Sequence, residues 1–448
     1  MKYGFLYKAI AKEFDTQPPI GALMISAIEI WDRIYRDCAP WLGENTRSAG
    51  VAAAVSAEVA RLMTFELHSS AEGSRVVSAA YTNLLAQLRK YVEYGAAKGT
   101  LIVKPIAVGD SISTQFIQAD RFFPLSFDGS GNVTDCVFTD RLIKGDTIYT
   151  LLERHSVSGN VLTIENRLYV SRTDGLLGSR VSLTAVDRWA DLPEGPTKIS
   201  GTTKLPFGMF KCPMANTIDS DSPMGMSCFG RAVEQIREAD SRYSDESWEF
   251  EAKEAAVHIS SAMLAFDKEQ GKHVYPGGRK RLYRTLDVAT GVNDKPMLDV
   301  YSPDIRYEAY SKGFNDQLRR IELSCSLAYG TLSDPQSVDK TATEILASKQ
   351  RSYSYISECQ HELENALNAW AEGALFWARL YGLESSSTVK LNYEWGDGVL
   401  SNPDAQREED RKDLANGTLR PEEYRAKYRN ETLDEALANL PDTASVIE

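Results

Sequence analysis

The first half of the chain changes from a helical to a β-strand pattern. Apolar residues recur every three or four positions in residues 24–68 and again in residues 78–99, where Gly99 predicts a helix end. From Thr100 the apolar period changes to two, which is typical of strands with one buried face. The strands expected from this period are 100–108, 113–118, 122–128, 133–143, 148–157, 161–171 and 181–186.

The second half is mostly helical, after a loop rich in Pro and Gly that ends at residue 227. We expect helices at 228–258, 304–330 and 341–385, with a small mixed insert at 259–303, a polar loop at 331–340 and a strand at 388–398. The charged tail predicts two short helices separated by "NGTLRP". Together with the strands of the first half, this pattern predicts an α+β protein.

The helix 228–258 carries a stripe of apolar residues interrupted by one acid. The stripe is heptad-like and consists of Phe229, Val233, Ile236, Tyr243 and Phe250, and Asp240 interrupts it. The segment contains eight acidic and four basic residues, a net charge of −4.

The long helix has a marked beginning. Thr341 and Glu344 fit a capping box, in which each side chain accepts a hydrogen bond from the backbone N–H of the other residue. At about 1.5 Å per residue the helix is a rod of roughly 60 Å. The polar loop before it has no evident partner within the chain.

Composition restricts the function classes. The chain has 448 residues, enough for two to four domains, and its formal net charge of −13 argues against a protein that clamps nucleic acid. No window has the roughly 20 apolar residues of a membrane helix, and the first residues do not resemble a secretory signal. The six cysteines form no C-x-x-C pair, so we expect reduced, mostly buried thiols and a cytosolic protein.

The usual catalytic motifs are missing, and we expect no enzymatic activity, cofactor or metal. No nucleophile elbow, phosphate-binding loop or zinc-protease motif is present, and the five histidines are never at ligand spacing. The acids of "EADSRYSDE" fit a solvated helix face better than a metal or general-acid site. The basic cluster in the insert fits either a solvated hairpin or a docking surface for a partner or phosphates; it comprises Lys268, Lys272, Arg279, Lys280, Arg281 and Arg284.

The order of these parts, and four stretches within them, resemble the portal proteins of tailed bacteriophages of the siphophage type. The stretches are residues 99–141, 210–240, 332–367 and 414–428. The resemblance covers nearly the whole chain and implies a ring of subunits, with a dodecamer expected, at one capsid vertex of the virion, assembled in the host cytoplasm. Double-stranded DNA passes through such a ring during packaging and ejection.

The resemblance also implies a division of the chain into the parts of a portal subunit. The wing is 1–227 together with the spine helix 341–385, the stem helices are 228–258 and 304–330, the clip is 259–303, and the crown is 386–448. The loop 331–340 becomes the tunnel loop, whose channel-lining residues are Ser333, Asp334, Gln336, Ser337, Asp339 and Lys340. Thr341 and Glu344 then stand where the loop meets the spine.

The resemblance implies several partners. The basic clip residues are expected to dock terminase and then head–tail adaptor proteins, while the ring also contacts the major capsid protein and scaffold. An acidic stem repeated around a ring is expected to repel DNA phosphates. The alternative is a cytosolic hydrolase with two carboxylates in a deep pocket. A head or tail adaptor is a further possibility, although such proteins are usually much shorter.

Overall fold

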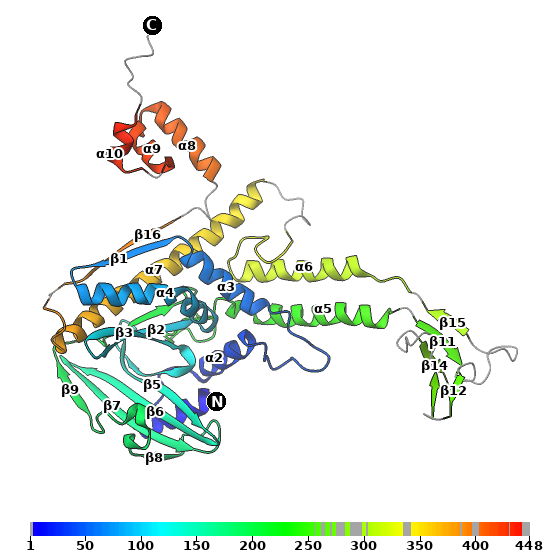
Figure 1. The fold of residues 1–448 in the computed structure, drawn as a ribbon, viewed down its shortest axis with the longest axis horizontal. Helices are drawn as coiled ribbons and strands as arrows, with labels where there is room; N and C mark the ends of the chain where they lie inside the picture. The colour runs from blue at the N-terminus through cyan, green and yellow to red at the C-terminus, as the bar shows by residue number, and fades with distance from the viewer. Residues whose placement is uncertain are drawn as a thin grey trace, which may run out of the picture.

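The structure is a computed structural model that combines helices with sheets (Figure 1). Helices account for 46% and antiparallel sheets for 23% of it, so the predicted α+β class is confirmed. The structure describes residues 3–254, 256–260, 265–268, 271–274, 283–286, 298–301, 303–334, 342–385, 388–396, 403–429 and 431–440.

The body of the molecule contains four helices of the N-terminal part and two larger antiparallel sheets, beside a two-stranded one formed by β1 (Leu67–Glu72) and β16 (Lys390–Trp395). The helices are α1 (Tyr3–Glu13), α2 (Ala22–Tyr35), α3 (Val51–Thr64) and α4 (Arg75–Lys98). One sheet has the order β10 (Gly208–Lys211), β2 (Thr100–Val108), β3 (Ser111–Gln118). The other has the order β4 (Phe122–Phe127), β5 (Val133–Lys144), β6 (Thr147–Ser158), β7 (Val161–Ser171), β8 (Ser179–Val181), with β9 (Thr197–Ser200) also paired to β7.

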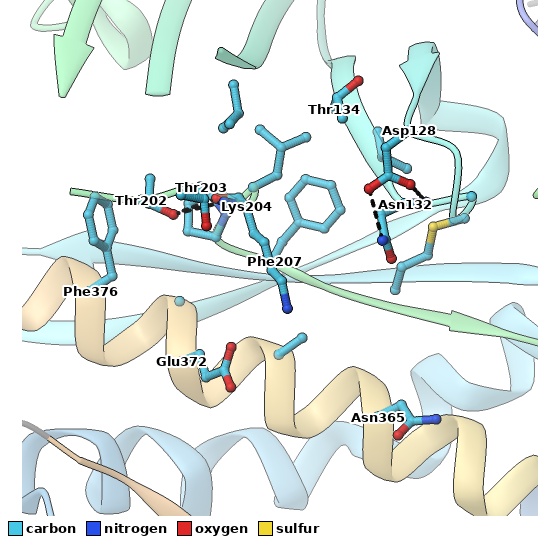
Figure 2. A pocket seen from close by; sticks show the side chains of 18 of the residues that line it. Asp128, Asn132, Thr134, Thr202, Thr203, Lys204, Phe207, Asn365, Glu372 and Phe376 are labelled. Carbon is cyan, nitrogen blue, oxygen red and sulfur yellow. Dashed lines mark hydrogen bonds between the residues drawn. The ribbon is translucent and has the colours of Figure 1, made fainter. Parts of the chain in front are cut away.

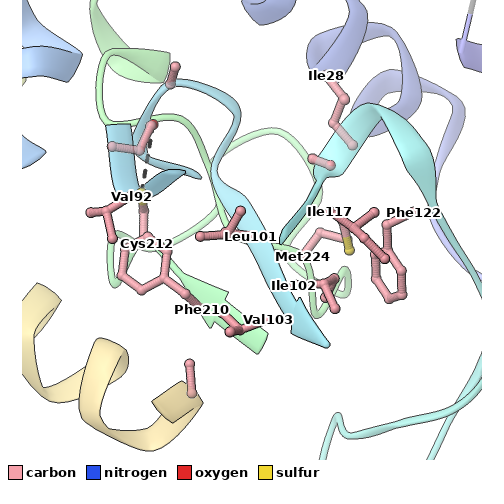
Figure 3. Close-up of a cluster of buried hydrophobic side chains, with 14 of the residues drawn as sticks. Ile28, Val92, Leu101, Ile102, Val103, Ile117, Phe122, Phe210, Cys212 and Met224 are labelled. Atoms are coloured by element: carbon pink, nitrogen blue, oxygen red, sulfur yellow. Dashed lines mark hydrogen bonds between the residues drawn. The ribbon is translucent and has the colours of Figure 1, made fainter. Parts of the chain in front are cut away.

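Local chemistry explains the bounds of α4 and of the strand that follows it. The Ser74 hydroxyl accepts a hydrogen bond from the Val77 N–H at 3.2 Å, which satisfies one of the free amides of the helix start. Gly99 ends the helix in the left-handed conformation at φ 80°, as its position in the sequence predicts. Strand β2 follows at once, and its Leu101 and Val103 pack with Phe210 of β10 in the core shown in Figure 3.

The long helix α7 (Ala342–Leu380) lies against the sheet formed by β10, β2 and β3. Two glycines permit this contact: a Cβ on Gly373 would lie 2.7 Å from the carbonyl oxygen of Pro206, and one on Gly208 would overlap the carbonyl oxygen of Ala366. Helix α7 ends at Leu380, before the expected residue 385, and Gly382 follows with φ +69°. Gly373 is therefore a packing residue within the helix.

Helices α5 (Val233–Ala252) and α6 (Tyr307–Ser324) run side by side and project from the body (Figure 1). We call this pair the arm. Short strands lie at its far end, and we call them the tip: β11 (Ala256–Ser260), β12 (Ala265–Asp267), β13 (Lys272–Val274), β14 (Tyr283–Leu286) and β15 (Leu298–Tyr301). The 20 residues of α5 and 18 of α6 are shorter than the predicted 228–258 and 304–330. A 3₁₀ turn covers 230–232 and the strand β11 begins at residue 256, while α6 begins at Tyr307 and ends at Ser324.

Several expectations about single elements are wrong. Residues 181–186 are not one strand, since β8 ends at Val181 and a 3₁₀ turn covers Leu183–Ala185. The helix expected up to residue 68 ends at Thr64, and β1 (Leu67–Glu72) pairs with β16 (Lys390–Trp395). The tail contains three helices instead of two within its described residues: α8 (Pro403–Asn416), α9 (Pro421–Arg429) and α10 (Leu433–Ala438).

The contact at Gly373 leads to a stability prediction. Gly373→Ala should lower the free energy of unfolding by about 1–3 kcal/mol, because the new methyl group overlaps the Pro206 backbone, although alanine favours helices. Denaturant unfolding measures this change. Gly313→Ala in α6 is the matched control, since its Cβ would meet only the Arg242 guanidinium, at 3.2 Å. Equal stability of the two variants would contradict the packing role of Gly373.

Candidate functional site

The base of the arm is fastened to the body by a buried carboxylate. Asp240 of α5 is 2% exposed and accepts hydrogen bonds from the Trp41 indole N–H and the Ala49 backbone N–H, both at 2.8 Å. Burial raises the pKa of Asp240, because the charged form loses hydration. The sequence pattern marks Asp240 as an acidic interruption of an apolar stripe; in the structure it joins α5 to the segment between α2 and α3.

The two helices of the arm also bind each other through polar and aromatic contacts. Gln317 donates to the carbonyl oxygen of Gln235 at 3.0 Å, and the Arg242 guanidinium donates to the carbonyl oxygen of Gly313 at 3.2 Å. The rings of Tyr243 and Phe314 lie 6.2 Å apart. These contacts fix which residues of the two antiparallel helices stand at the same height along the arm.

A second buried carboxylate links the two chain segments at the outer end of the arm. Glu249 near the end of α5 is 1% exposed and receives two hydrogen bonds from the Arg306 guanidinium, at 3.0 and 2.8 Å. These hydrogen bonds lower the pKa of Glu249 to about 2. Glu249 precedes the tip and Arg306 follows it, so the ion pair joins the two chain segments on either side of the tip.

A third carboxylate holds the polar loop that follows α6. Glu322 is 0% exposed and its oxygens accept from the backbone N–H groups of Leu332 at 2.6 Å, Ser333 at 2.8 Å and Gly330 at 3.3 Å. The Ser333 hydroxyl also donates to Glu322, at 2.9 Å. The loop therefore has a partner within the chain up to Ser333, contrary to the expectation from its polar sequence.

The structure places only part of the predicted channel lining. Ser333 is 5% exposed and faces Glu322, so its side chain is an anchor of the loop. Asp334 is exposed, and its backbone N–H donates to the Asn315 side chain at 2.7 Å. Outside the described residues lie Gln336, Ser337, Asp339, Lys340 and Thr341, as does the side chain of Glu344 in α7.

The basic residues of the insert are described only in part. Lys268, directly after β12, is exposed. Lys272 belongs to β13 and Arg284 to β14, and their side chains lie outside the described residues. Arg279, Lys280 and Arg281 also lie outside them. The basic cluster therefore stays a prediction.

The apolar stripe of α5 has two different environments. Phe229 and Ile236 at its beginning are buried in the body, whereas Tyr243 is 39% and Phe250 45% exposed along the arm. Trp248 is 63% exposed, and sequence reasoning missed it because it does not belong to the stripe. Trp248 follows the acidic Asp245 by three residues, so both lie on one side of the helix. This spacing could have identified Trp248 as a surface residue. The arm thus exposes large aromatic side chains to solvent.

The surface of α5 carries less negative charge than its sequence indicates. Two of its carboxylates, Asp240 and Glu249, are buried and bind donors of the same chain. Their charges do not face solvent, so the expected acidic wall of the stem is weaker than the net charge of the segment implies.

One described cavity contains carboxylates of the kind that the hydrolase alternative requires. A cavity of about 430 Å³ lies between α7 and the loops at 128–134 and 202–207, and is lined by Asp128, Glu362 and Glu372 (Figure 2). Asp128 accepts hydrogen bonds from the Asn132 side chain at 3.0 Å and from the Asn132 and Ser130 backbones. These bonds lower its pKa, the reverse of what a general acid needs.

A buried cluster of charged and polar side chains lies between the two sheets, and its contacts indicate a structural role. Lys104 of β2 donates to the Glu153 carboxylate of β6 at 2.6 and 2.7 Å, and His155 lies 2.6 Å from the same carboxylate. Burial raises the pKa of Glu153, but Lys104 and His155 outweigh it and the pKa is lowered overall. A carboxylate held between the Lys104 ammonium and the His155 imidazole joins the two sheets, and its lowered pKa makes it poorly suited to proton transfer.

Neither a metal nor a membrane site emerges among the residues that the structure describes. Within them, no three or more His, Cys, Asp or Glu side chains are arranged to hold a metal ion. No described helix has the length and apolar character to cross a membrane.

Comparison of the chain with models of protein families gives no match, and comparison with curated proteins gives none either. Its function is therefore argued from its residues and its fold.

The loop anchor gives a prediction about local order. Glu322→Ala should lower the free energy of unfolding by about 3 kcal/mol, because three backbone N–H groups lose their buried acceptor. Hydrogen exchange at Leu332 and Ser333 should become faster in this variant. Asp316→Ala, an exposed acid on the same helix, is the control and should change stability by at most about 0.5 kcal/mol. Unchanged exchange at both amides would contradict the anchor.

The Glu249–Arg306 pair gives a pH prediction. The pKa of Glu249 is lowered from 4.5 to about 2, so the pair stabilises the fold above about pH 4.5 and loses this contribution as the pH falls toward 2. Glu249→Gln should therefore be less stable than the wild type at neutral pH, and the difference should shrink on acidification. Urea unfolding over this range measures it, with Glu246→Gln as control. A difference independent of pH would contradict the pair.

Proposed function

We propose that this chain is the subunit of a phage portal, a ring that conducts double-stranded DNA into and out of a capsid. The observation that carries the proposal is the arm: two antiparallel helices project from the α+β body, held by Asp240 at the base and Glu249 at the outer end, with large aromatic side chains exposed. Exposed apolar surface can mark an interaction site, and these aromatic side chains on a projecting element are the candidates for one. Other copies of the chain are the partners that cover it.

The order of the parts supports the same proposal. The body corresponds to the wing, the arm to the stem, the tip to the clip, α7 to the spine and α8–α10 to the crown. Each part occurs in the chain order that the resemblance to portal proteins implies. The likeness of residues 99–141, 210–240, 332–367 and 414–428 to those proteins adds to it.

The proposal assigns the polar loop a role in the channel. Because Ser333 is held by Glu322, the channel-lining segment begins at Asp334, which is exposed. Glu322 then serves as the fixed point from which this segment leaves α6. The remaining lining residues of the proposal are Gln336, Ser337, Asp339 and Lys340.

The proposal gives the tip the role of docking other proteins. Terminase would bind there during packaging and head–tail adaptor proteins afterwards, through Lys268 and the other basic residues of the insert. The capsid protein and scaffold would contact the ring from outside, in the virion. The protein would have no catalytic activity and no cofactor of its own.

Electron microscopy of the purified full-length chain tests the proposal. We expect ring particles with a central opening, because the exposed arm surfaces are covered only when several copies assemble. Replacing the segment between Ser333 and Ala342 by a shorter linker should leave these rings intact and impair DNA packaging. A protein that stays monomeric at every concentration and salt tested contradicts the ring, and normal packaging by the shortened chain contradicts the loop assignment.

A further inference from the structure

Both helices of the arm carry the same pair of neighbouring residues, an arginine followed by a tyrosine. Arg242 and Tyr243 lie in α5, and Arg306 and Tyr307 stand at the beginning of α6. Tyr243 is 39% and Tyr307 53% exposed, and the Arg306 side chain is 61% exposed. Each helix therefore presents a guanidinium group next to an aromatic ring.

The contacts between the helices place the arginines and the tyrosines on opposite sides of the arm. Arg242 donates to the carbonyl oxygen of Gly313, and Arg306, seven residues before Gly313, lies on the same side of α6. Each tyrosine follows its arginine by about 100° around the helix, so it lies on the other side of the line that joins the two helices. We call the side of Arg242 and Arg306 the guanidinium side, and that of Tyr243 and Tyr307 the ring side.

Aromatic contacts across the arm agree with this division. The rings of Tyr243 and Phe314 lie 6.2 Å apart, and those of Phe250 and Tyr307 lie 6.1 Å apart. Phe250 follows Tyr243 by seven residues, so both lie on one side of α5. The ring side therefore carries two pairs of aromatic rings. Phe314 packs partly on the body, whereas Phe250 is 45% exposed.

The guanidinium groups and the rings stand at the same heights along the arm. Arg242 and Tyr243 are neighbours in the chain, as are Arg306 and Tyr307, so the heights within each pair differ by about 1.5 Å. Rotation about an axis that runs along the arm keeps every residue at its height. Copies related by such a rotation bring each tyrosine to the height of the same arginine in the next copy.

The polar loop gives the orientation of the arm in the proposed ring. The loop leaves α6, where the Asp334 backbone N–H donates to the Asn315 side chain at 2.7 Å. Because this loop is proposed to line the channel, α6 is the helix on the channel side and α5 is the outer helix. The two remaining sides of the arm then face the two neighbouring copies. One copy's ring side meets the next copy's guanidinium side, a head-to-tail contact of the kind that closes into a ring.

We infer that the ring side of one copy docks on the guanidinium side of the next, with Tyr243 over Arg242 and Tyr307 over Arg306. This inference rests on the proposed ring. The face of an aromatic ring attracts a guanidinium group because the ring quadrupole is negative there. Among the described residues Arg242 has no carboxylate partner, so the ring of the next copy supplies the electrostatic partner that this cation lacks.

Both guanidinium groups are held in position before the docking. Arg306 donates to the buried Glu249 at 3.0 and 2.8 Å. Arg242 lies against Gly313, where a Cβ would stand 3.2 Å from the guanidinium, so the absence of a side chain leaves room for this group. Groups that are already ordered lose less entropy when they bind a partner. The exposed rings add apolar burial, which salt screens much less than it screens pairs of exposed charges.

An exchange of neighbouring residues tests the docking. Tyr243→Arg should raise the subunit concentration needed for half-assembly of rings by about ten-fold or more, because two guanidinium groups then meet at every interface. Adding Arg242→Tyr to this variant should restore assembly, because a ring and a cation meet again with their positions exchanged. Sedimentation velocity over a range of concentrations measures the change.

The control makes the same substitution outside the arm. Tyr381→Arg, directly after α7 and at a residue that is 60% exposed, should leave the half-assembly concentration unchanged. Circular dichroism establishes that each variant is folded.

A covalent test needs no argument from charge. Ser247 follows Tyr243 by four residues and lies on the ring side, whereas Asp245 follows Arg242 by three and lies on the guanidinium side. Their heights differ by about 3 Å. In a Cys38→Ser background, which removes the exposed cysteine, Asp245→Cys combined with Ser247→Cys should give a ladder of multimers with a short bismaleimide. Either cysteine alone should give no ladder.

A matched pair of cysteines is placed on the faces that point away from the partner helix. Ser241 precedes Arg242 and Lys312 precedes Gly313, so each is turned further from the other helix. Ser241→Cys combined with Lys312→Cys should give no ladder, because these residues face the outside and the channel.

The outcomes separate the docking from the proposed function. A wild-type chain that forms no ring overturns the ring, and the docking with it. Wild-type rings with unchanged assembly of Tyr243→Arg, or with no rescue by Arg242→Tyr, overturn the docking and leave the ring standing. Rings in which the cysteines at 245 and 247 give no ladder, or in which those at 241 and 312 give one, likewise overturn the docking alone.

Discussion

A buried carboxylate needs hydrogen-bond donors to offset its lost hydration, and on the arm these donors lie outside the helix that carries the carboxylate. Asp240 takes them from the loop between α2 and α3, Glu249 from the residue that follows the tip, and Glu322 from the loop before α7. A donor pointing elsewhere leaves a charge unsatisfied, so each contact permits one arrangement. The direction of the arm, the closure of the tip and the start of the polar loop all depend on these contacts.

Because the arm is held in one position, its exposed aromatic side chains can serve as a binding surface. On the 20 residues of α5 and the 18 of α6, Trp248, Phe250 and Tyr307 remain 63%, 45% and 53% exposed, although the rings of Phe250 and Tyr307 lie 6.1 Å apart. A flexible pair of helices would not hold these side chains in one arrangement. Held in place, the same side chains are available to another copy, and the proposed ring would cover every arm.

The sequence predicts elements well where the signal is local. Strand β7 begins and ends as its alternation of apolar and polar residues predicts, and Gly99 ends α4 as expected. Prediction fails where the partner is distant: β1 depends on β16, more than 300 residues later. The site residues show the same limit. From the sequence alone, Asp240 is only an acidic residue within an apolar stripe and Ser333 a polar loop residue. Their partners Trp41 and Glu322 are not adjacent to them in sequence, so the pairing is seen only in the structure.

The central claim is that copies of this chain complete one another's surface in a closed ring. Native mass spectrometry of the full-length protein at low salt tests it most directly. The account predicts one dominant assembly whose mass is a fixed integer multiple of 49.8 kDa, with no series of open intermediates. A spectrum that contains only the single chain, or a continuous series of growing filaments, would contradict it.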